Sequence, residues 1–276
     1  MAKLNRTTTP RFWRDPALPF VEARDVLDGR QQCYAKHAHE TFSVGTVTQG
    51  RSIYLNEKNR EQIGAGSVVL MNPGDVHACN PLAGQPWSYR MFYVDVAWLN
   101  ELQQQLGFSH NQSLHAFSAT LSHDPVLYNG LNHLYTLLSD PQADTLHKHC
   151  ALLDCFSELQ QRLEPAPQRR REDNPRIRLA AEFIHEHCTQ PLKLDDICAA
   201  AGLSASYLTR AFRRGYGMTP HTYLINSRIQ YAQNRLRRGG EIAEVALAAG
   251  FADQAHFQRA FKQLLAATPG QYRRPA

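Results

Sequence analysis

Two stretches near the end of the chain, DDICAAAGLSASYLTRAF at residues 195–212 and AEVALAAGFADQAHFQRAF at residues 243–261, are copies of one pattern. Ala-Gly recurs at residues 201–202 and 249–250, and Arg-Ala-Phe recurs at 210–212 and 259–261. A Thr-Pro pair and a tyrosine three residues beyond it follow both copies. The offset is 48 residues before the turn and 49 after it, so the second copy has one additional turn residue. This repeat predicts two copies of one supersecondary unit.

Each copy has the pattern of a helix-turn-helix. A short Ala-rich helix is expected to end at Gly202 or Gly250, because glycine adopts a positive φ without strain. Ser204 and Asp253 are then the N-caps of the second helices, where a side-chain oxygen accepts a hydrogen bond from an unpaired N–H. Between the copies, residues 220–238 place Leu224, Ile225, Ile229, Ala232 and Leu236 on one helical face. A rigid linking helix would hold the two motifs apart, and reading successive major grooves needs roughly 34 Å.

The basic residues are concentrated in the same part of the chain. The formal net charge of the 276 residues is +5, yet residues 175–276 hold 14 Lys and Arg against 7 Asp and Glu. The remainder of the chain has a net charge of −2. A polyanion, most commonly nucleic acid, is therefore the expected partner of the C-terminal segment.

The outer faces of the two second helices are polar and basic. In the first copy they present Ser206, Thr209, Arg210 and Arg213, and in the second Gln254, His256, Gln258, Arg259 and Lys262. Such groups suit base edges and phosphates in a major groove, so all nine are predicted DNA contacts. An alternative for Arg210 or Arg259 is a structural ion pair with an acidic residue of the same segment.

Over residues 175–274, the tandem motif, the linking helix and the closing pattern GFADQAHFQRAFK resemble the DNA-binding domain of AraC-family transcriptional regulators. The resemblance implies a sequence-specific regulator, usually an activator, with repression left open. It also implies that the first reading helix makes the stronger base contacts, through Ser206, Thr209 and Arg210. The matching positions of the second helix are Gln254, His256 and Arg259. No catalytic role is expected.

The front half contains two successive kinds of sequence pattern. Residues 30–96 contain short β-like runs between turns, such as residues 42–48 before a break at Gly50, which predict a sandwich or barrel. From Trp98 to Leu163 the apolar spacing is helical, with one stripe at Leu127, Leu131, Leu134 and Leu138 and another from Leu146 to Leu163. These helices could cover the barrel or pair with their copies in a homodimer. The segment 164–174, rich in proline and charge, is predicted to be a linker.

The front half resembles the cupin-type barrel found in many AraC-family members, through Gly50, Gly66 and the runs YAKHAHE at 34–40 and PGDVH at 73–77. The resemblance implies a small effector inside the barrel and an N-terminal arm to which Phe12 and Trp13 could belong. The effector contacts it suggests are Trp13, His37, His39, His77, Trp87, Tyr89 and Tyr93. Core packing is the alternative for the aromatic residues. Weak similarity to regulators encoded beside amino-acid exporters suggests an amino acid or a related metabolite.

The expected fold is thus multidomain: a cupin-like β-barrel with an N-terminal arm over residues 1–97, then a helical dimerisation or cover segment over 98–163. The linker over 164–174 and an all-α tandem helix-turn-helix domain over 175–276 complete it. The expected partners are double-stranded DNA, the effector, a second copy of the chain and RNA polymerase.

Three histidines leave a second interpretation open. His37, His39 and His77 could hold a metal ion, since imidazole suits Zn, Fe, Ni or Mn. Metal cupins normally add a carboxylate three or four residues beyond the second histidine, where this chain has Phe42 and Ser43. We therefore expect no metal and no other cofactor. The alternative function is a metal-dependent cupin enzyme fused to a DNA-binding domain.

The remaining features indicate a cytoplasmic protein. No apolar run of the sequence is long enough to span a membrane, and the first residues have no secretory signal pattern. The six cysteines are scattered without a CxxC motif, so we expect reduced and mostly buried thiols.

Overall fold

The computed structural model describes residues 10–30, 32–56, 59–82, 85–109, 113–165 and 174–273. The chain folds into two compact units: the described residues up to Cys33 and from His39 to residue 165 form the first, and the segment Tyr34–Ala38 with residues 174–273 forms the second. Most of the predicted linker, the first nine residues and the last three lie outside the described residues. Among the described residues, no helix is both long and apolar enough to cross a bilayer.

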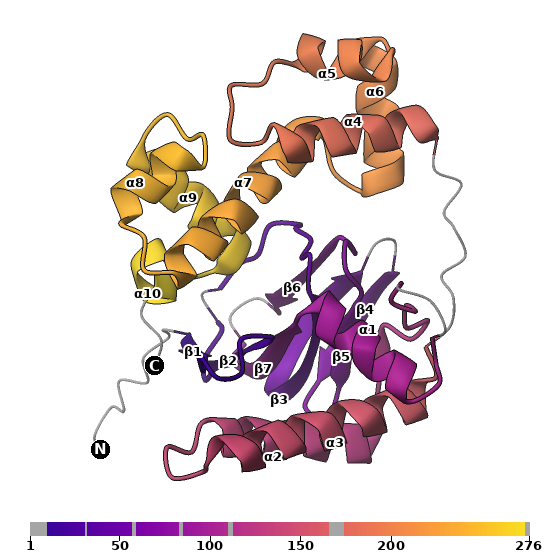
Figure 1. Cartoon of the computed structure of the whole chain (residues 1–276), viewed down its shortest axis with the longest axis vertical. Coiled ribbons are helices and arrows are strands. Elements are labelled where there is room, and N and C mark those ends of the chain that lie inside the picture. Colours follow the sequence, from indigo (N-terminus) through magenta and orange to yellow (C-terminus); the bar gives the residue numbers. More distant parts are fainter. Residues whose placement is uncertain are drawn as a thin grey trace. The chain divides into compact units, whose positions relative to one another are not determined.

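The first unit is an antiparallel β-sheet domain (Figure 1). Its strands are β1 (Arg11–Trp13), β2 (Val21–Val26), β3 (Phe42–Asn56), β4 (Asn59–Gly64), β5 (Val68–Met71), β6 (His77–Pro81), β7 (Trp87–Val94) and β8 (Leu121–Ser122). The order β1-β2-β7-β3-β5-β8 is joined by β4 and β6, which both pair with the second half of β3. The predicted break at Gly50 is wrong: β3 continues through it, with a register shift between Val47 and Gln49 and a φ of 73° at Gly50.

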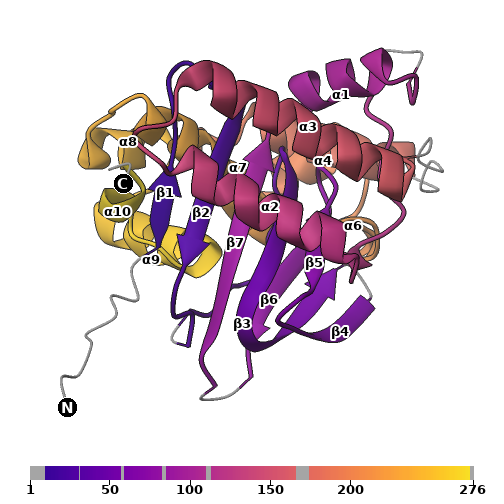
Figure 2. The same ribbon diagram turned by 90° about the horizontal axis from the view of Figure 1, so that it is seen from below.

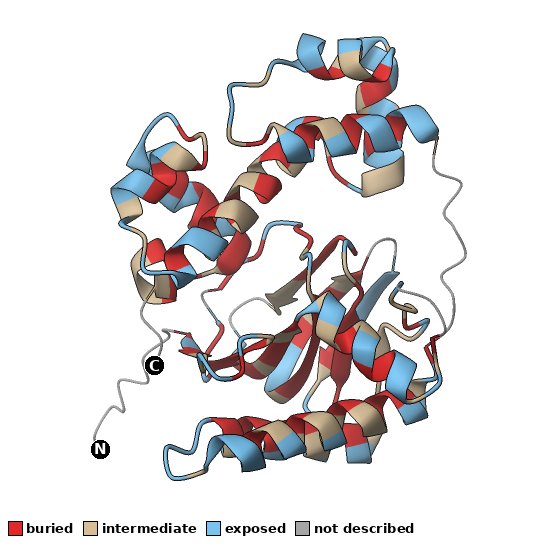
Figure 3. Ribbon diagram, in the orientation of Figure 1, coloured by how far each residue is buried: buried red, intermediate tan, exposed pale blue. Residues whose placement is uncertain are grey.

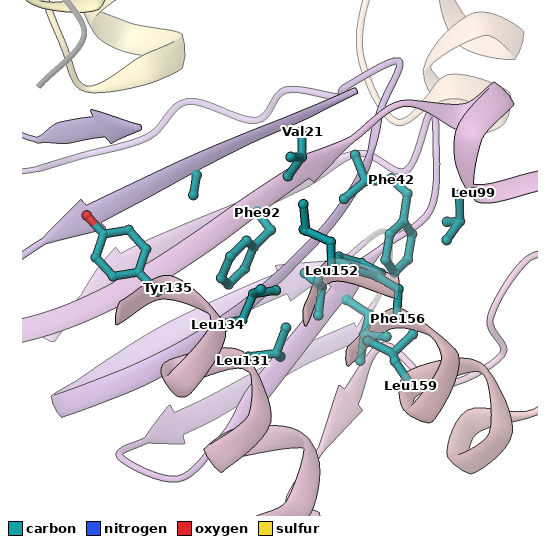
Figure 4. Close-up of a cluster of buried hydrophobic side chains, with 14 of the residues drawn as sticks. Val21, Phe42, Phe92, Leu99, Leu131, Leu134, Tyr135, Leu152, Phe156 and Leu159 are labelled. Atoms are coloured by element: carbon teal, nitrogen blue, oxygen red, sulfur yellow. The ribbon is translucent and has the colours of Figure 1, made fainter. Parts of the chain in front are cut away.

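Three helices accompany the sheet, namely α1 (Val96–Gln105) before β8, and α2 (Pro125–Leu138) and α3 (Thr145–Leu163) after it. Figure 2 shows α2 and α3 running side by side across one face of the sheet. Side chains of the strands, such as Phe42 and Phe92, form one buried cluster with those of the helices, such as Leu131 and Phe156 (Figure 4). These helices therefore cover the sheet. Leu146, predicted to lie in the second apolar stripe, is instead 73% exposed on the first turn of α3.

Phe12 and Trp13, predicted to lie in an arm before the first strand, are part of β1. Phe12 pairs with Arg24 and Trp13 with Ala23 in the neighbouring β2. Neither strand was predicted from the sequence. The expectation of mostly buried cysteines was also wrong: of the six, Cys188 is buried, Cys33 and Cys150 are exposed, and the other three are partly exposed.

The second unit is helical. It contains α4 (Pro175–Glu186), α5 (Leu194–Ala201), α6 (Ala205–Tyr216), α7 (Pro220–Arg237), α8 (Ile242–Ala248), α9 (Gln254–Leu265) and α10 (Pro269–Arg273). Helices α5 and α6 are the first helix-turn-helix, α8 and α9 are the second, and α7 runs continuously between them (Figure 1). Figure 3 shows that the buried residues of these helices lie on the sides where helices pack together.

The turns of the two motifs have the predicted chemistry. Gly202 and Gly250 have φ values of 62° and 80°. The Ser204 hydroxyl accepts a hydrogen bond from the N–H of Tyr207, and the Asp253 carboxylate accepts one from the N–H of His256. The second helices also end alike, with Gly217 and Ala266 both in the left-handed region at φ 67° and 48°. The repeat in the sequence is thus a repeat of backbone conformation.

Candidate nucleic-acid interface and effector site

Helix α6 presents the four predicted contacts of the first motif on its outer side. Leu208 and Phe212 are buried, which turns Ser206, Arg210 and Arg213 to solvent and leaves Thr209 half-buried. Arg210 Nε donates to the Ser206 carbonyl of its own helix at 3.3 Å. Arg210 has no acidic partner among the described residues, so its charge is available to a base or a phosphate.

Helix α9 presents an equivalent surface. Gln254, Gln258, Arg259 and Lys262 are exposed. His256 is half-buried, with its ring edge-on to Phe251 at 5.2 Å between centroids. Arg259 likewise forms no ion pair within the described part of the chain, so the structural alternative raised for the two arginines is not what the structure shows.

Two further residues of α6 belong to this surface and were not predicted. Tyr207 is 44% exposed beside Ser206, and its hydroxyl accepts a hydrogen bond from Asn174 Nδ2 at 3.1 Å. Arg214 is exposed next to Arg213. Tyr207 is recognisable only once the helix start at Ala205 is known, because that start places it in the first turn.

In the first unit, strand register divides the predicted effector residues between two faces of the sheet. Side chains alternate along a strand, and directly paired residues share a face. Tyr93 pairs with Ser43, whereas Phe92 pairs with Val44 on the face covered by α2 and α3. Trp87, Tyr89 and Tyr93 are separated by even numbers of residues along β7, so they lie on the same face, opposite those helices. Trp87 and Tyr89 stack there at 4.4 Å between ring centroids.

Trp13 lies on the other face. It pairs with Ala23, packs against the cluster beneath the helices and has Lys148 Nζ 5.9 Å from its ring centroid. The structure therefore separates Trp13 from the other predicted effector contacts.

Two of the three predicted histidines, His39 and His77, lie together in the sheet unit, whereas His37 lies in the segment Tyr34–Ala38, which belongs to the second unit. The His39 ring lies 4.9 Å from that of His77 and meets the ring of Tyr93 edge-on at 5.1 Å. A ligand on the Tyr93 face would therefore meet imidazole groups.

Backbone carbonyls fix the tautomers of two of these rings. The Nδ1 of His77 lies 2.8 Å from the carbonyl of Asp75, and the Nδ1 of His37 lies 2.8 Å from that of Ala35. Since a carbonyl only accepts, Nδ1 must donate, which puts the lone pair of the neutral ring on Nε2. Burial lowers the pKa of His77 to about 4. His77 is thus a neutral imidazole at physiological pH, suited to accept a hydrogen bond or to bind a metal.

Two buried polar residues on the same face were not predicted. The Ser43 hydroxyl is completely buried with no hydrogen-bond partner among the described residues. Arg24 is 2% exposed, and its guanidinium lies 5.3 and 5.8 Å from the ring centroids of Phe12 and Tyr89. Ser43 pairs with Tyr93, and Arg24 pairs with Met91, so both side chains lie on the Tyr93 face. The sequence alone could not show this, because the pairing of the strands must be known.

The comparisons with known proteins agree with this architecture. Residues 23–156 match the family model described as an AraC-like ligand binding domain, and residues 197–275 match one described as a helix-turn-helix domain. The regulator YbfI of Bacillus subtilis is 26% identical over 258 residues, which cover 91% of this chain and 90% of YbfI. The transcriptional activator RhaS of Klebsiella pneumoniae is 22% identical, with 84% of this chain and 85% of RhaS covered.

Among solved structures, apo ToxT from Vibrio cholerae superimposes with a TM-score of 0.59 at 16% identity, covering 92% of this chain and 97% of ToxT. At that identity the likeness establishes the fold. The two family matches lie in the order in which the sheet unit and the tandem motif occur here. The chain belongs to the AraC family of transcriptional regulators, with an N-terminal ligand-binding domain and a C-terminal helix-turn-helix DNA-binding domain.

Proposed function

We propose that this regulator reads DNA with α6 and α9 and activates transcription when an effector binds its sheet domain. The observation that supports the DNA contacts is the exposure of Arg210, Arg213, Arg259 and Lys262 on the two second helices, without acidic partners among the described residues. Amide and hydroxyl groups on the same faces supply base-edge contacts, and the guanidinium and ammonium groups supply phosphate contacts. The likeness to RhaS, an activator, supports activation.

The proposed effector site is the sheet face that holds Tyr89, Tyr93, His39 and His77. Aromatic walls with a few fixed polar groups are typical of small-molecule sites. Arg24 brings a buried positive charge to this face, which suits a carboxylate. A ToxT structure contains an unsaturated fatty acid, which is also a carboxylate. We therefore propose an amino acid or a related carboxylate metabolite.

Effector control requires that the molecule bind two arrangements of the protein with different affinities. Equal affinity would shift no equilibrium, however tight the binding. We propose that the active form is a homodimer that contacts RNA polymerase in the cytoplasm, where the chromosome lies. The exposed Leu146 on α3 supports this proposal, because it gives the helices of the sheet domain an apolar side chain that a second copy could contact.

A selection and a binding screen test these proposals. DNA selected from a random pool by the full-length protein should be protected over two successive major grooves. In a thermal-shift screen of carboxylate metabolites, the effector should raise the melting temperature of the wild-type protein. The Tyr93→Ala variant should show no such rise. If the selection yields no preferred sequence, the protein would instead be an architectural DNA binder. If no metabolite of the panel alters the melting temperature, effector binding on this face would be contradicted.

The histidine group supports one competing function, a metal-dependent enzyme joined to a DNA-binding domain. The imidazoles of His39 and His77, whose ring centroids lie 4.9 Å apart, could contribute ligands to Zn²⁺ or Fe²⁺. We propose that the chain is a regulator and not an enzyme, because its relatives are transcriptional regulators and because no carboxylate of the described residues is grouped with these histidines. Metal analysis of purified protein decides. Stoichiometric metal that is lost in a His37→Ala/His39→Ala variant, together with substrate turnover, would favour the enzyme.

A further inference from the structure

Arg228 lies on α7, one helical turn beyond the buried Leu224 of the first motif's core. Its Nε donates to the carbonyl of Cys188 at 2.7 Å, and its terminal Nη2 donates to the carbonyl of Gln190 at 2.9 Å. Both carbonyls belong to the loop between α4 and α5. A planar guanidinium can hold two acceptors at once, which the single ammonium of lysine does less well.

The other side of the same guanidinium faces the second motif. Its Cζ lies 5.8 Å from the ring centroid of Phe251, which follows the turn glycine of that motif and is buried. Partial burial lowers the pKa of Arg228, though it stays charged at any physiological pH. One side chain of the linking helix therefore contacts the loop that leads into the first motif and the turn of the second.

The backbones also meet directly at this point. A Cβ added at Gly250 would lie 2.7 Å from the carbonyl oxygen of Thr189 and 3.2 Å from Cζ of Arg228. The equivalent glycine of the first motif, Gly202, has nothing within 4 Å of such a Cβ. Positive φ explains both glycines, but only Gly250 is also needed for a close approach of two backbones.

We propose that Arg228 and Gly250 lock the two helix-turn-helix motifs into one rigid body and so determine which half-site spacing the protein accepts. Both are positioning residues, since they act on the placement of α6 and α9. The inference rests on the proposed reading of DNA by both helices. A locked pair loses affinity at any mismatch in spacing, because one inserted base pair displaces the second half-site by about 3.4 Å and rotates it by about 35°.

The test uses the full-length chain and a DNA site selected by the wild-type protein, with derivatives that have one base pair inserted or deleted between the protected half-sites. Fluorescence anisotropy gives the affinities, and circular dichroism establishes that each variant is folded. Wild type should lose at least about tenfold in affinity on either derivative, since each mismatched contact typically costs about 1–3 kcal/mol. In Arg228→Ala and Gly250→Ala, affinity for the parent site should fall while the spacing penalty shrinks to below about threefold.

Two matched controls should keep the wild-type spacing penalty. Gly202→Ala introduces the same left-handed strain in the first motif without a contact to the second, and Arg235→Ala removes an exposed charge from α7. If Arg228→Ala does not fold, Arg228→Lys retains the charge with weaker anchoring and should give an intermediate penalty. An unchanged penalty in folded Arg228→Lys and Gly250→Ala, or a wild type indifferent to spacing, would overturn the inference. Failure to select any DNA would instead contradict the proposed DNA reading.

Discussion

His77 should make the sheet domain sensitive to acid. Burial lowers its pKa from 6.5 to about 4, while in the unfolded chain the ordinary value returns. Between these two pH values the unfolded state binds a proton that the folded state does not, so stability falls as the pH falls through this window. The loss is about 1.4 kcal/mol per pH unit and sums to about 3 kcal/mol at pH 4. Above pH 6.5 this stability is fully present.

Urea unfolding followed by tryptophan fluorescence, in the presence of a chelator, measures this effect. All three tryptophans, at positions 13, 87 and 98, belong to the sheet domain, so the signal reports on that domain alone. The matched variant is His77→Gln, which retains a donor for the Asp75 carbonyl but does not titrate. The quantity of interest is the difference in unfolding free energy between wild type and variant at each pH.

That difference should be constant above pH 6.5. By pH 4 the wild type should have lost about 3 kcal/mol of stability relative to the variant. The carboxyl of Asp75, whose pKa burial raises, acts in the opposite direction, because lowering the pH relieves its buried charge. Asp75 is present in both proteins, so its contribution cancels in the comparison. A difference that stays flat from pH 7.5 to 4.5 would refute the assignment of His77 as a buried neutral imidazole.

Three further predictions concern the helical domain. Arg210→Ala should cost roughly 1–3 kcal/mol on the selected site and much less on random DNA; equal losses on both would mean that Arg210 contacts only phosphate or stabilises the fold. Ala266→Gly should raise the unfolding free energy of the domain by up to about 1 kcal/mol and Gly217→Ala should lower it by a similar amount, because both positions have a positive φ; chemical denaturation of each variant checks this. The fragment 175–276 should bind DNA alone, with an affinity that falls steeply with salt; a folded fragment without salt-sensitive binding would contradict the domain division.

The helical unit was predictable because its determinants are local. Each turn is fixed by a glycine and a capping side chain within a few residues, so the repeat alone indicated Gly202, Ser204 and Asp253. The close approach at Gly250 could not be predicted, since it involves Thr189, which is 61 residues earlier in the sequence.

The sheet was less predictable because its side chains depart from simple alternation. Strand β2 buries charged residues, with Glu22 paired to Arg14 at 2.6 Å and Asp25 to Arg90 at 3.4 Å. A period-two search for apolar residues misses such a strand. Ser43 and Arg24, on the proposed effector face, were missed for a related reason, since only the register between strands shows that they share a face with Tyr93.

The contrast between the two turn glycines also bears on how each copy of the repeat can change by mutation. Asparagine tolerates a positive φ better than other residues with a side chain. Open space around Gly202 should allow asparagine there, whereas any side chain at Gly250 must displace the Thr189 carbonyl and so disturb the placement of the second motif. The turn position 202 of the first copy can therefore accept other residues, whereas position 250 of the second copy should retain glycine. Random mutagenesis with selection for regulation should recover substitutions at position 202 and none at position 250.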